Sequence, residues 1–233
     1  MIISGMQSLT LLDYPGKVAC TVFLHGCNFR CPFCHNSALL SGDAETLMTD
    51  EAFFAFLEKR RGLLDAVCVS GGEPTLQPGL PGLLARIKAM GFLTKLDTNG
   101  SRPQVLQRLI ESGLLDYVAM DVKNSAARFC ETAGTPVDTA CIEASLRLLS
   151  GSGLPYELRT TVVSELHSAE SIQEMGRWVS GVCAPRRIPA LYLQPFADRD
   201  SVLQQGLHKP CNEEIQQYLN ILRPYAEFVS IRG

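Results

Sequence analysis

The sequence predicts an α/β protein, a partial and laterally open β/α barrel of about six units. Short apolar segments of strand-like composition alternate with segments whose apolar residues recur at helical spacing, and this alternation repeats about six times. Apolar strands covered by helices are typical of a parallel sheet. Because a complete barrel closes with eight such units, about six units lead us to expect an open side.

The expected strands are short apolar runs rich in residues that favour β structure. They lie at residues 18–24, 66–69, 92–96, 117–120, 157–163 and 191–195, with a small closing strand at 227–231. Thr49 is expected to cap the first helix, and Pro103 to start the third. Apolar spacing predicts further helices at about residues 80–87, 142–149, 169–179 and 215–222.

Composition fits a soluble globular protein, and length leads us to expect a single domain over residues 1–233, in which residues 1–16 form a lead-in. The net charge is −3 and no basic stripe is present, so we expect no nucleic-acid partner. No signal peptide is expected, and no apolar run approaches the ~20 residues of a membrane helix. Of the nine cysteines, six are scattered and the total is odd, so we expect no disulfide framework and a reducing, cytoplasmic location.

A loop with three cysteines follows the first expected strand. Cys27, Cys31 and Cys34 are separated by three and two residues, so their thiolates can face one metal centre. Iron–sulfur clusters usually have four Cys ligands, and three would leave one iron open for chemistry. The alternative is a structural zinc bound by the three cysteines and His35. It is disfavoured because His35 follows Cys34 directly, whereas zinc ligands normally stand two or more residues apart.

Polar groups follow the ends of the next three expected strands. They are Gly71-Gly72-Glu73-Pro74, Asp97-Thr98-Asn99-Gly100 and Asp121-Val122-Lys123. Because β/α barrels place their active sites at the carboxyl ends of the strands, these groups and the cysteine loop are expected at one mouth. Considered alone, the glycine pair is consistent with an ordinary turn. The two aspartates with Lys123 are equally consistent with a partly buried ion pair.

The cysteine loop, followed by a glycine-rich motif, resembles the cluster loop of the radical SAM (S-adenosylmethionine) superfamily. The resemblance covers about residues 13–195 and implies a barrel of the radical SAM type. It also implies that Cys27, Cys31 and Cys34 bind a 4Fe-4S cluster whose open iron is chelated by SAM. Phe33, Cys34 and His35 are then expected to contact SAM, with Phe33 beside the adenine.

The later motifs resemble those of glycyl-radical-enzyme activases. By the resemblance to the superfamily, Gly71, Gly72 and Glu73 pair with the amino group of SAM, and the following roles are those that the activases imply. Lys123 contacts the SAM carboxylate, and Arg159 lines the same pocket. The remaining expected SAM contacts lie around the two aspartates and are Asp97, Thr98, Asn99, Asp121 and Val122. A monovalent cation is expected near Asp97 and Asp121.

Two stretches depart from the usual activase pattern. Asp13-Tyr14-Pro15-Gly16-Lys17 is similar to the activating proteins of anaerobic ribonucleoside-triphosphate reductase, the subgroup that the chain resembles most. Gln194-Pro195-Phe196-Ala197 lacks a histidine that contacts SAM in some activases. His25, His167 and His208 match no motif and are expected to be surface or packing residues.

The resemblance implies an oxidoreductase that cleaves SAM reductively, giving methionine and a 5′-deoxyadenosyl radical. No catalytic residue is expected beyond the ligands of cluster and cofactor. The expected hydrogen donor is a glycine of a partner enzyme, anaerobic ribonucleotide reductase, and the expected electron donor is a flavodoxin. One alternative is a radical SAM enzyme for a small molecule, similar to 7-carboxy-7-deazaguanine synthase. The other is a non-catalytic metal-binding or electron-transfer module.

Overall fold

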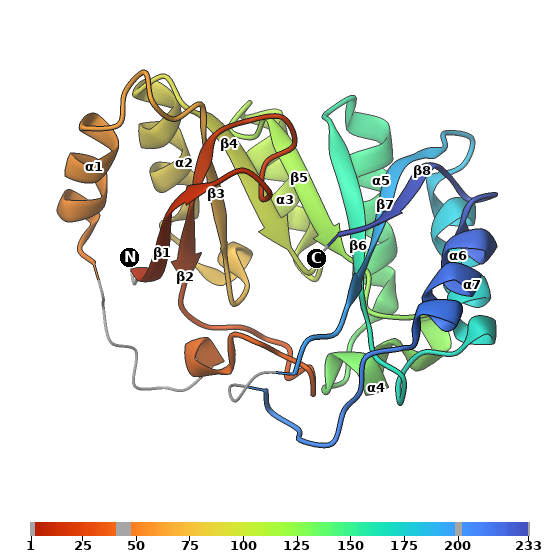
Figure 1. Ribbon diagram of the computed structural model, residues 1–233. Helices are drawn as coiled ribbons and strands as arrows, with labels where there is room; N and C mark the ends of the chain where they lie inside the picture. The colour runs from red at the N-terminus through yellow and green to blue at the C-terminus, as the bar shows by residue number, and fades with distance from the viewer. Residues whose placement is uncertain (1–2, 41–47, 199–201, 233) are drawn as a thin grey trace. The chain divides into compact units, whose positions relative to one another are not determined.

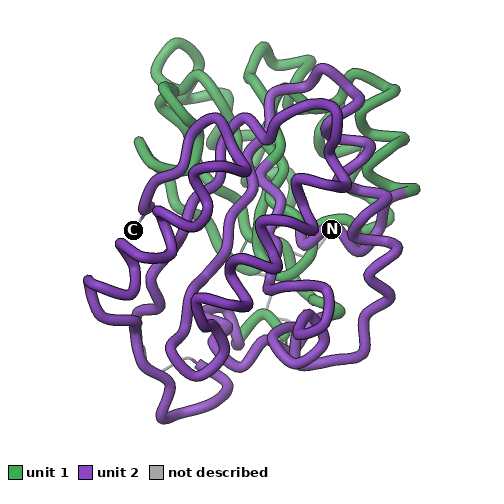
Figure 2. The backbone as a smooth tube through the Cα atoms, turned by 90° about the vertical axis from the view of Figure 1, so that its right-hand side faces the viewer, with its two compact units in different colours: residues 1–28, 38–98, 104–118 green, residues 29–37, 99–103, 119–233 purple. Residues whose placement is uncertain are grey.

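The computed structural model describes residues 3–40, 48–198 and 202–232. It confirms the α/β class, because strands β1 to β8 follow one another in that order in one open, mostly parallel sheet. The chain divides by its internal contacts into two compact units (Figure 2). Unit 1 comprises residues 1–28, 38–98 and 104–118, and unit 2 comprises residues 29–37, 99–103 and 119–233. The single domain over residues 1–233 stays a prediction.

Unit 1 contains the first four strands: β1 (Ile3–Thr10), β2 (Ala19–Leu24), β3 (Ala66–Gly71) and β4 (Leu93–Thr98). Strand β1 pairs with β2 in antiparallel fashion, whereas β2, β3 and β4 are parallel (Figure 1). Its helices are α1 (Asp50–Glu58), α2 (Leu80–Ala89) and most of α3 (Pro103–Glu111). Short 3₁₀ turns are η1 (Ser37–Leu40) and η2 (Pro74–Leu76). Strand β5 (Tyr117–Asp121) then takes the chain from unit 1 into unit 2.

Local sequence explains where these elements begin. Thr49 caps α1 as predicted, because its hydroxyl accepts a hydrogen bond from the Ala52 amide at 3.2 Å. Pro103 is the first residue of α3, as predicted. Strand β1 was not predicted, since residues 1–16 were expected to be a lead-in. Its middle, Gln7 to Leu9, is exposed, which hides the alternation typical of a strand.

Unit 2 contains the parallel strands β6 (Tyr156–Val162), β7 (Ile188–Pro195) and β8 (Ala226–Ile231). Its helices are η3 (Ala126–Arg128), α4 (Phe129–Ala133), α5 (Thr139–Ser152), α6 (Ala169–Cys183) and α7 (Asn212–Leu222). Figure 1 shows α6 and α7 side by side next to β7 and β8. Helix α6 begins at a capping box formed by Ser168 and Ser171, and ends one turn beyond its predicted range. None of the helices in the described ranges is both long and apolar enough to cross a bilayer.

Candidate active site

The cysteine loop follows β2 directly, as predicted. Cys27 belongs to unit 1, and Cys31 and Cys34 belong to unit 2. Within unit 2 the Cys34 amide donates to the Cys31 carbonyl at 3.0 Å, and the Arg30 amide donates to the Ala133 carbonyl at 2.9 Å. Over the described ranges, no three His, Cys, Asp or Glu side chains are gathered as for one metal ion. The three-cysteine ligand set therefore stays a prediction.

Unit 2 brings Cys31 close to charged groups at and just after the end of β5. Cys31 is buried, and burial raises the pKa of its thiol. The Lys123 ammonium lowers that pKa, whereas Cys34 and Asp121 raise it, so these three groups act electrostatically on the Cys31 thiol. Cys31, Lys123 and Asp121 were predicted to belong to one site, and that assignment stays a prediction.

Asp121 is the centre of an ion-pair network at the end of β5. Its carboxylate accepts hydrogen bonds from Lys123 Nζ and Arg159 Nε, each at 3.0 Å. Burial alone would raise the pKa of Asp121, but the two cations hold it at about 2. The Val122 amide also donates to the Arg159 carbonyl at 2.8 Å, which fixes the network between two backbone segments. An ion-paired carboxylate of this kind stays charged across the neutral range.

Buried polar side chains fix the backbone of Lys123 and its neighbour. The Val163 amide donates to Nδ1 of His167 at 3.1 Å, so Nε2 carries the proton and donates to the Lys123 carbonyl at 2.9 Å. The fully buried Asn124 donates to Thr132 Oγ1 at 2.9 Å and to the Leu166 carbonyl at 2.8 Å. His167 is the packing residue that the sequence analysis expected. Its bond to Lys123 was missed because no motif surrounds it.

The glycine motif of unit 1 lies directly against the residues that precede and begin the cysteine loop. Gly71 has a φ of +124°, and a Cβ there would lie 2.3 Å from the backbone of Leu24. A Cβ on Gly72 would lie 2.0 Å from the Gly26 oxygen and 3.1 Å from the Cys27 nitrogen. The Glu73 amide donates to the Gly26 carbonyl at 2.7 Å. Only glycine permits so close an approach, which is a physical reason for the pair.

The Glu73 side chain is fully buried and organises the turn after β3. Its Oε1 accepts hydrogen bonds from the Thr75 amide at 3.0 Å and from the Thr98 hydroxyl at 2.8 Å, as well as from the Thr75 hydroxyl. The bond from Thr98 joins the end of β4 to the glycine motif. Asp97, next to Thr98, forms an ion pair with Lys95. Unit 1 thus brings together the predicted residues of the motif and those at the end of β4.

The other predicted contacts lie in unit 2. Asn99 is buried and its Oδ1 accepts from the Ser101 amide at 3.0 Å, while Phe33 is 5% exposed. His35 Nε2 lies 2.7 Å from the Ala197 carbonyl, and its ring stacks on Phe196 with centroids 5.6 Å apart. The stretch after β7, which lacks the histidine of some activases, is therefore contacted by a histidine of the cysteine loop.

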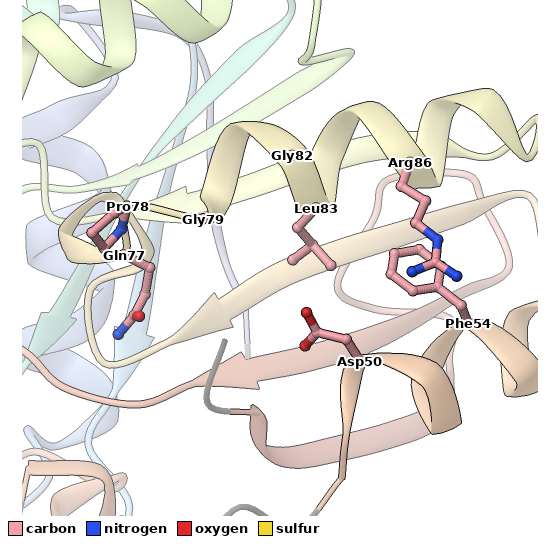
Figure 3. A pocket seen from close by; sticks show the side chains of 8 residues that line it. All are labelled: Asp50, Phe54, Gln77, Pro78, Gly79, Gly82, Leu83 and Arg86. Carbon is pink, nitrogen blue, oxygen red and sulfur yellow. The ribbon is translucent and has the colours of Figure 1, made fainter.

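A pocket of about 370 Å³ lies between α1 and α2 in unit 1 (Figure 3). Its walls include Asp50, Phe54, Leu83 and Arg86, and the Arg86 guanidinium lies 3.7 Å from the centre of the Phe54 ring. None of the residues that line it is a predicted site residue. Gln77, at its edge, donates to the His25 carbonyl at 2.7 Å, just before the cysteine loop.

Replacing Gly72 with alanine should disrupt the contact between the glycine motif and the cysteine loop. The added Cβ would meet backbone rather than a flexible side chain, so we expect a loss of at least ~2 kcal/mol in the free energy of unfolding. Gly82→Ala is the matched control, because its Cβ meets nothing within 4 Å and Gly82 lies inside α2. Urea titration measures both. A Gly72→Ala variant as stable as the Gly82→Ala variant would contradict the tight contact.

Asp121→Asn should make stability less sensitive to acid. The pKa of Asp121 is depressed to about 2, so its contribution is complete above the ordinary carboxyl pKa and is lost as pH falls toward 2. Between pH 4.5 and 2.5, the wild type should lose up to roughly 2 kcal/mol more free energy of unfolding than the variant. Denaturant titrations at several pH values measure the two slopes. If the free energy of unfolding depended on pH equally in the wild type and the variant, the ion pairs would not lower the pKa of Asp121.

The chain matches one family model and is similar in sequence to several known proteins. The family model described as Radical SAM superfamily matches residues 21–179. A Methanocaldococcus jannaschii protein, whose name provisionally calls it a glycyl-radical enzyme activating enzyme, is 32% identical over 99% of this chain and 95% of its own. Pyruvate formate-lyase-activating enzyme of Streptococcus mutans is 28% identical over 76% of this chain and 72% of its own. 7-Carboxy-7-deazaguanine synthase of Thermococcus kodakarensis is 25% identical over 74% and 70%.

Solved structures with low sequence identity share the fold. A domain of pyruvate-formate lyase-activating enzyme from Bacteroides vulgatus superposes with a TM-score of 0.60 at 22% identity, covering 72% of this chain and 99% of that domain. Coproporphyrinogen III oxidase of Escherichia coli, described as a radical SAM enzyme, gives a TM-score of 0.57 at 15% identity, covering 89% and 52%. These similarities confirm the predicted fold type.

Proposed function

The chain belongs to the radical SAM superfamily, and from this premise we propose that it is the activating enzyme of a glycyl radical enzyme. One observation carries the proposal. The Methanocaldococcus jannaschii protein that is named as such an enzyme is 32% identical over 99% of this chain and 95% of its own length. A match over both full lengths supports a shared activity better than a shared domain would.

Membership of the superfamily implies a 4Fe-4S cluster and SAM, and the residues present fit both groups. Thiolates are the ligands of such clusters, and we assign them to Cys27, Cys31 and Cys34. Gly72 lies so close to Gly26 and Cys27, at the start of the cysteine loop, that position 72 has no room for a side chain. When bound, the reduced cluster would supply the one electron that SAM accepts for cleavage of the bond between its sulfur and 5′ carbon, giving methionine and a 5′-deoxyadenosyl radical.

The chain's own residues bind and orient SAM in this proposal. Lys123, which lies near Cys31 and is fixed through its carbonyl by His167, binds the SAM carboxylate by a charge-assisted hydrogen bond. Asp121, which also accepts a hydrogen bond from Arg159, holds the Lys123 side chain in place. The backbone of Gly71 and Gly72 accepts the amino group, and the buried Glu73 keeps that turn rigid. The side chains of Phe33 and His35 cover the adenosyl group and exclude water.

Thr98, Asn99 and Val122 complete the proposed SAM contacts through their position at the ends of β4 and β5. We propose that the substrate is a backbone glycine of anaerobic ribonucleotide reductase, with a flavodoxin as one-electron donor and the cytoplasm as location. The similarity to Streptococcus mutans pyruvate formate-lyase-activating enzyme supports a glycyl radical enzyme as the kind of partner. The similarity to 7-carboxy-7-deazaguanine synthase keeps a small-molecule reaction as the second candidate.

The test mixes the reconstituted, reduced protein and SAM with an anaerobic ribonucleotide reductase from the same source. We expect a glycyl radical signal in electron paramagnetic resonance and one 5′-deoxyadenosine for each radical formed. A partner variant with alanine at the radical glycine is the control and should give no signal. Catalytic turnover of the substrate of 7-carboxy-7-deazaguanine synthase, with no radical on the reductase, would support the second candidate instead.

A further inference from the structure

Strand β4 carries a lysine whose side chain is completely buried. Lys95 is 0% exposed, and its ammonium forms an ion pair with the carboxylate of Asp97, which is 12% exposed. The Tyr117 ring centre lies 6.0 Å from Lys95 Nζ. Lysine is almost never fully buried unless it is paired, so the pair with Asp97 explains why the charge is tolerated. It does not explain why a strand would carry lysine there rather than an apolar residue.

Lys95 belongs to a polar layer inside unit 1. Backbone register places Thr21, Cys68 and Lys95 next to one another on β2, β3 and β4. Asp13 reaches this layer from the lead-in, where its carboxylate accepts a hydrogen bond from the Thr21 hydroxyl at 2.5 Å. The pKa of the Cys68 thiol is raised to about 12, mainly by burial. The charge of Lys95 lowers this pKa, whereas the charges of Asp97 and Asp13 raise it. All three charged groups therefore lie near Cys68. Lys95 therefore stands among carboxylates from two segments.

Along β4, the layer leads to the residues that contact the glycine motif. Asp97 is two residues beyond Lys95 on the same strand, so both side chains leave the same face of the sheet. Thr98, the next residue, donates to the buried Glu73 of the glycine motif. Moving Asp97 would thus disturb the end of β4 where the motif is attached. A fixed positive charge beneath Asp97 holds its carboxylate in one position.

We propose that Lys95 is a positioning residue that serves as a built-in counter-cation for Asp97, so that no diffusible monovalent cation is needed there. This inference rests on the proposed function in one respect, that the site beside Asp97 binds SAM. In unit 2, Asp121 has its own cations from the chain in Lys123 and Arg159. The two carboxylates near which the sequence predicted a monovalent cation are therefore each paired with a side-chain cation, and the site does not fit a further one.

The experiment uses the anaerobically reconstituted protein in potassium chloride and in tetramethylammonium chloride of equal ionic strength. For the wild type, we expect the SAM dissociation constant to agree within about twofold between the two salts, and the midpoint of thermal unfolding not to depend on potassium. A wild type whose SAM affinity or unfolding midpoint rises with potassium would overturn the inference. This experiment uses the wild-type protein alone.

Lys95→Met removes the ammonium and, because methionine is one atom shorter, leaves space for a cation of similar size. We expect the variant to bind SAM about tenfold more weakly in tetramethylammonium than in potassium, and potassium to raise its unfolding midpoint. Lys88→Met is the matched control, since Lys88 pairs with Asp116 at 2.6 Å outside the polar layer, and it should respond to salt as the wild type does. A Lys95→Met variant that ignores the salt would overturn the inference.

The two proposals fail in different ways. A wild type that binds no SAM in either salt would contradict the proposed function. The unfolding midpoints of the wild type and Lys95→Met would still decide the role of Lys95, because they report cation binding without SAM.

Discussion

SAM cleavage should fall to background in each of the variants Cys27→Ala, Cys31→Ala and Cys34→Ala. A cubane cluster bound by three thiolates has no spare protein ligand, so the loss of any one leaves two and the cluster is not retained. The measurements are iron content after anaerobic reconstitution and 5′-deoxyadenosine formed on reduction with dithionite. The expected loss is complete, because the protein's residues supply no other route to break the bond between sulfur and carbon.

Cys141→Ala is the control for these three variants. Cys141 lies in α5, outside the motif, and alanine suits a helix, so the variant should keep its iron and its activity. Full cleavage of SAM by any of the three motif variants would show that the cluster has a different set of ligands.

Lys123→Ala should weaken SAM binding while leaving the cluster in place. Hydrogen bonds to charged groups contribute about 1.5–3 kcal/mol, which corresponds to a dissociation constant raised roughly 10- to 100-fold. Asp121 keeps its bond to Arg159 at 3.0 Å in this variant, so the network at the end of β5 is only partly lost. Equilibrium binding of SAM and iron content are measured on the same preparations.

Lys88→Ala is the matched control for Lys123→Ala. It also removes a lysine that pairs with an aspartate, at 2.6 Å, but in unit 1, and neither Lys88 nor Asp116 is a predicted site residue. SAM affinity should be unchanged in this control. If Lys123→Ala lost iron and SAM affinity to the same extent, Lys123 would have a structural role, and the assignment to the SAM carboxylate would be wrong.

Much of the fold could be predicted because most strands can be identified from their own apolar, β-forming residues. Strand β3, for example, is buried over Ala66–Val69, and its residues are apolar and β-forming, so composition alone identified it. Strand β1 was missed because three of its residues are exposed and its apolar pattern is broken. Helix α4 was missed because its five residues are too few to show helical periodicity.

The candidate site was predictable to the extent that its chemistry lies in short motifs. Residues 71–74 and 121–123 stand at the carboxyl ends of parallel strands, where sequence reasoning expected them. Lys95 and His167 could not be found this way. The role of His167 depends on the Lys123 carbonyl, 44 residues away in sequence, and that of Lys95 depends on its complete burial by the fold. A lysine inside a strand looks the same in sequence whether it is solvated or buried.

The most direct test of radical SAM chemistry in this chain is spectroscopic. The protein is reconstituted anaerobically with iron and sulfide and reduced with dithionite. Its electron paramagnetic resonance spectrum is then recorded with and without SAM while 5′-deoxyadenosine is assayed. We expect a reduced-cluster signal that SAM changes, together with formation of 5′-deoxyadenosine. A colourless protein that binds one zinc ion and is unaffected by SAM would contradict it.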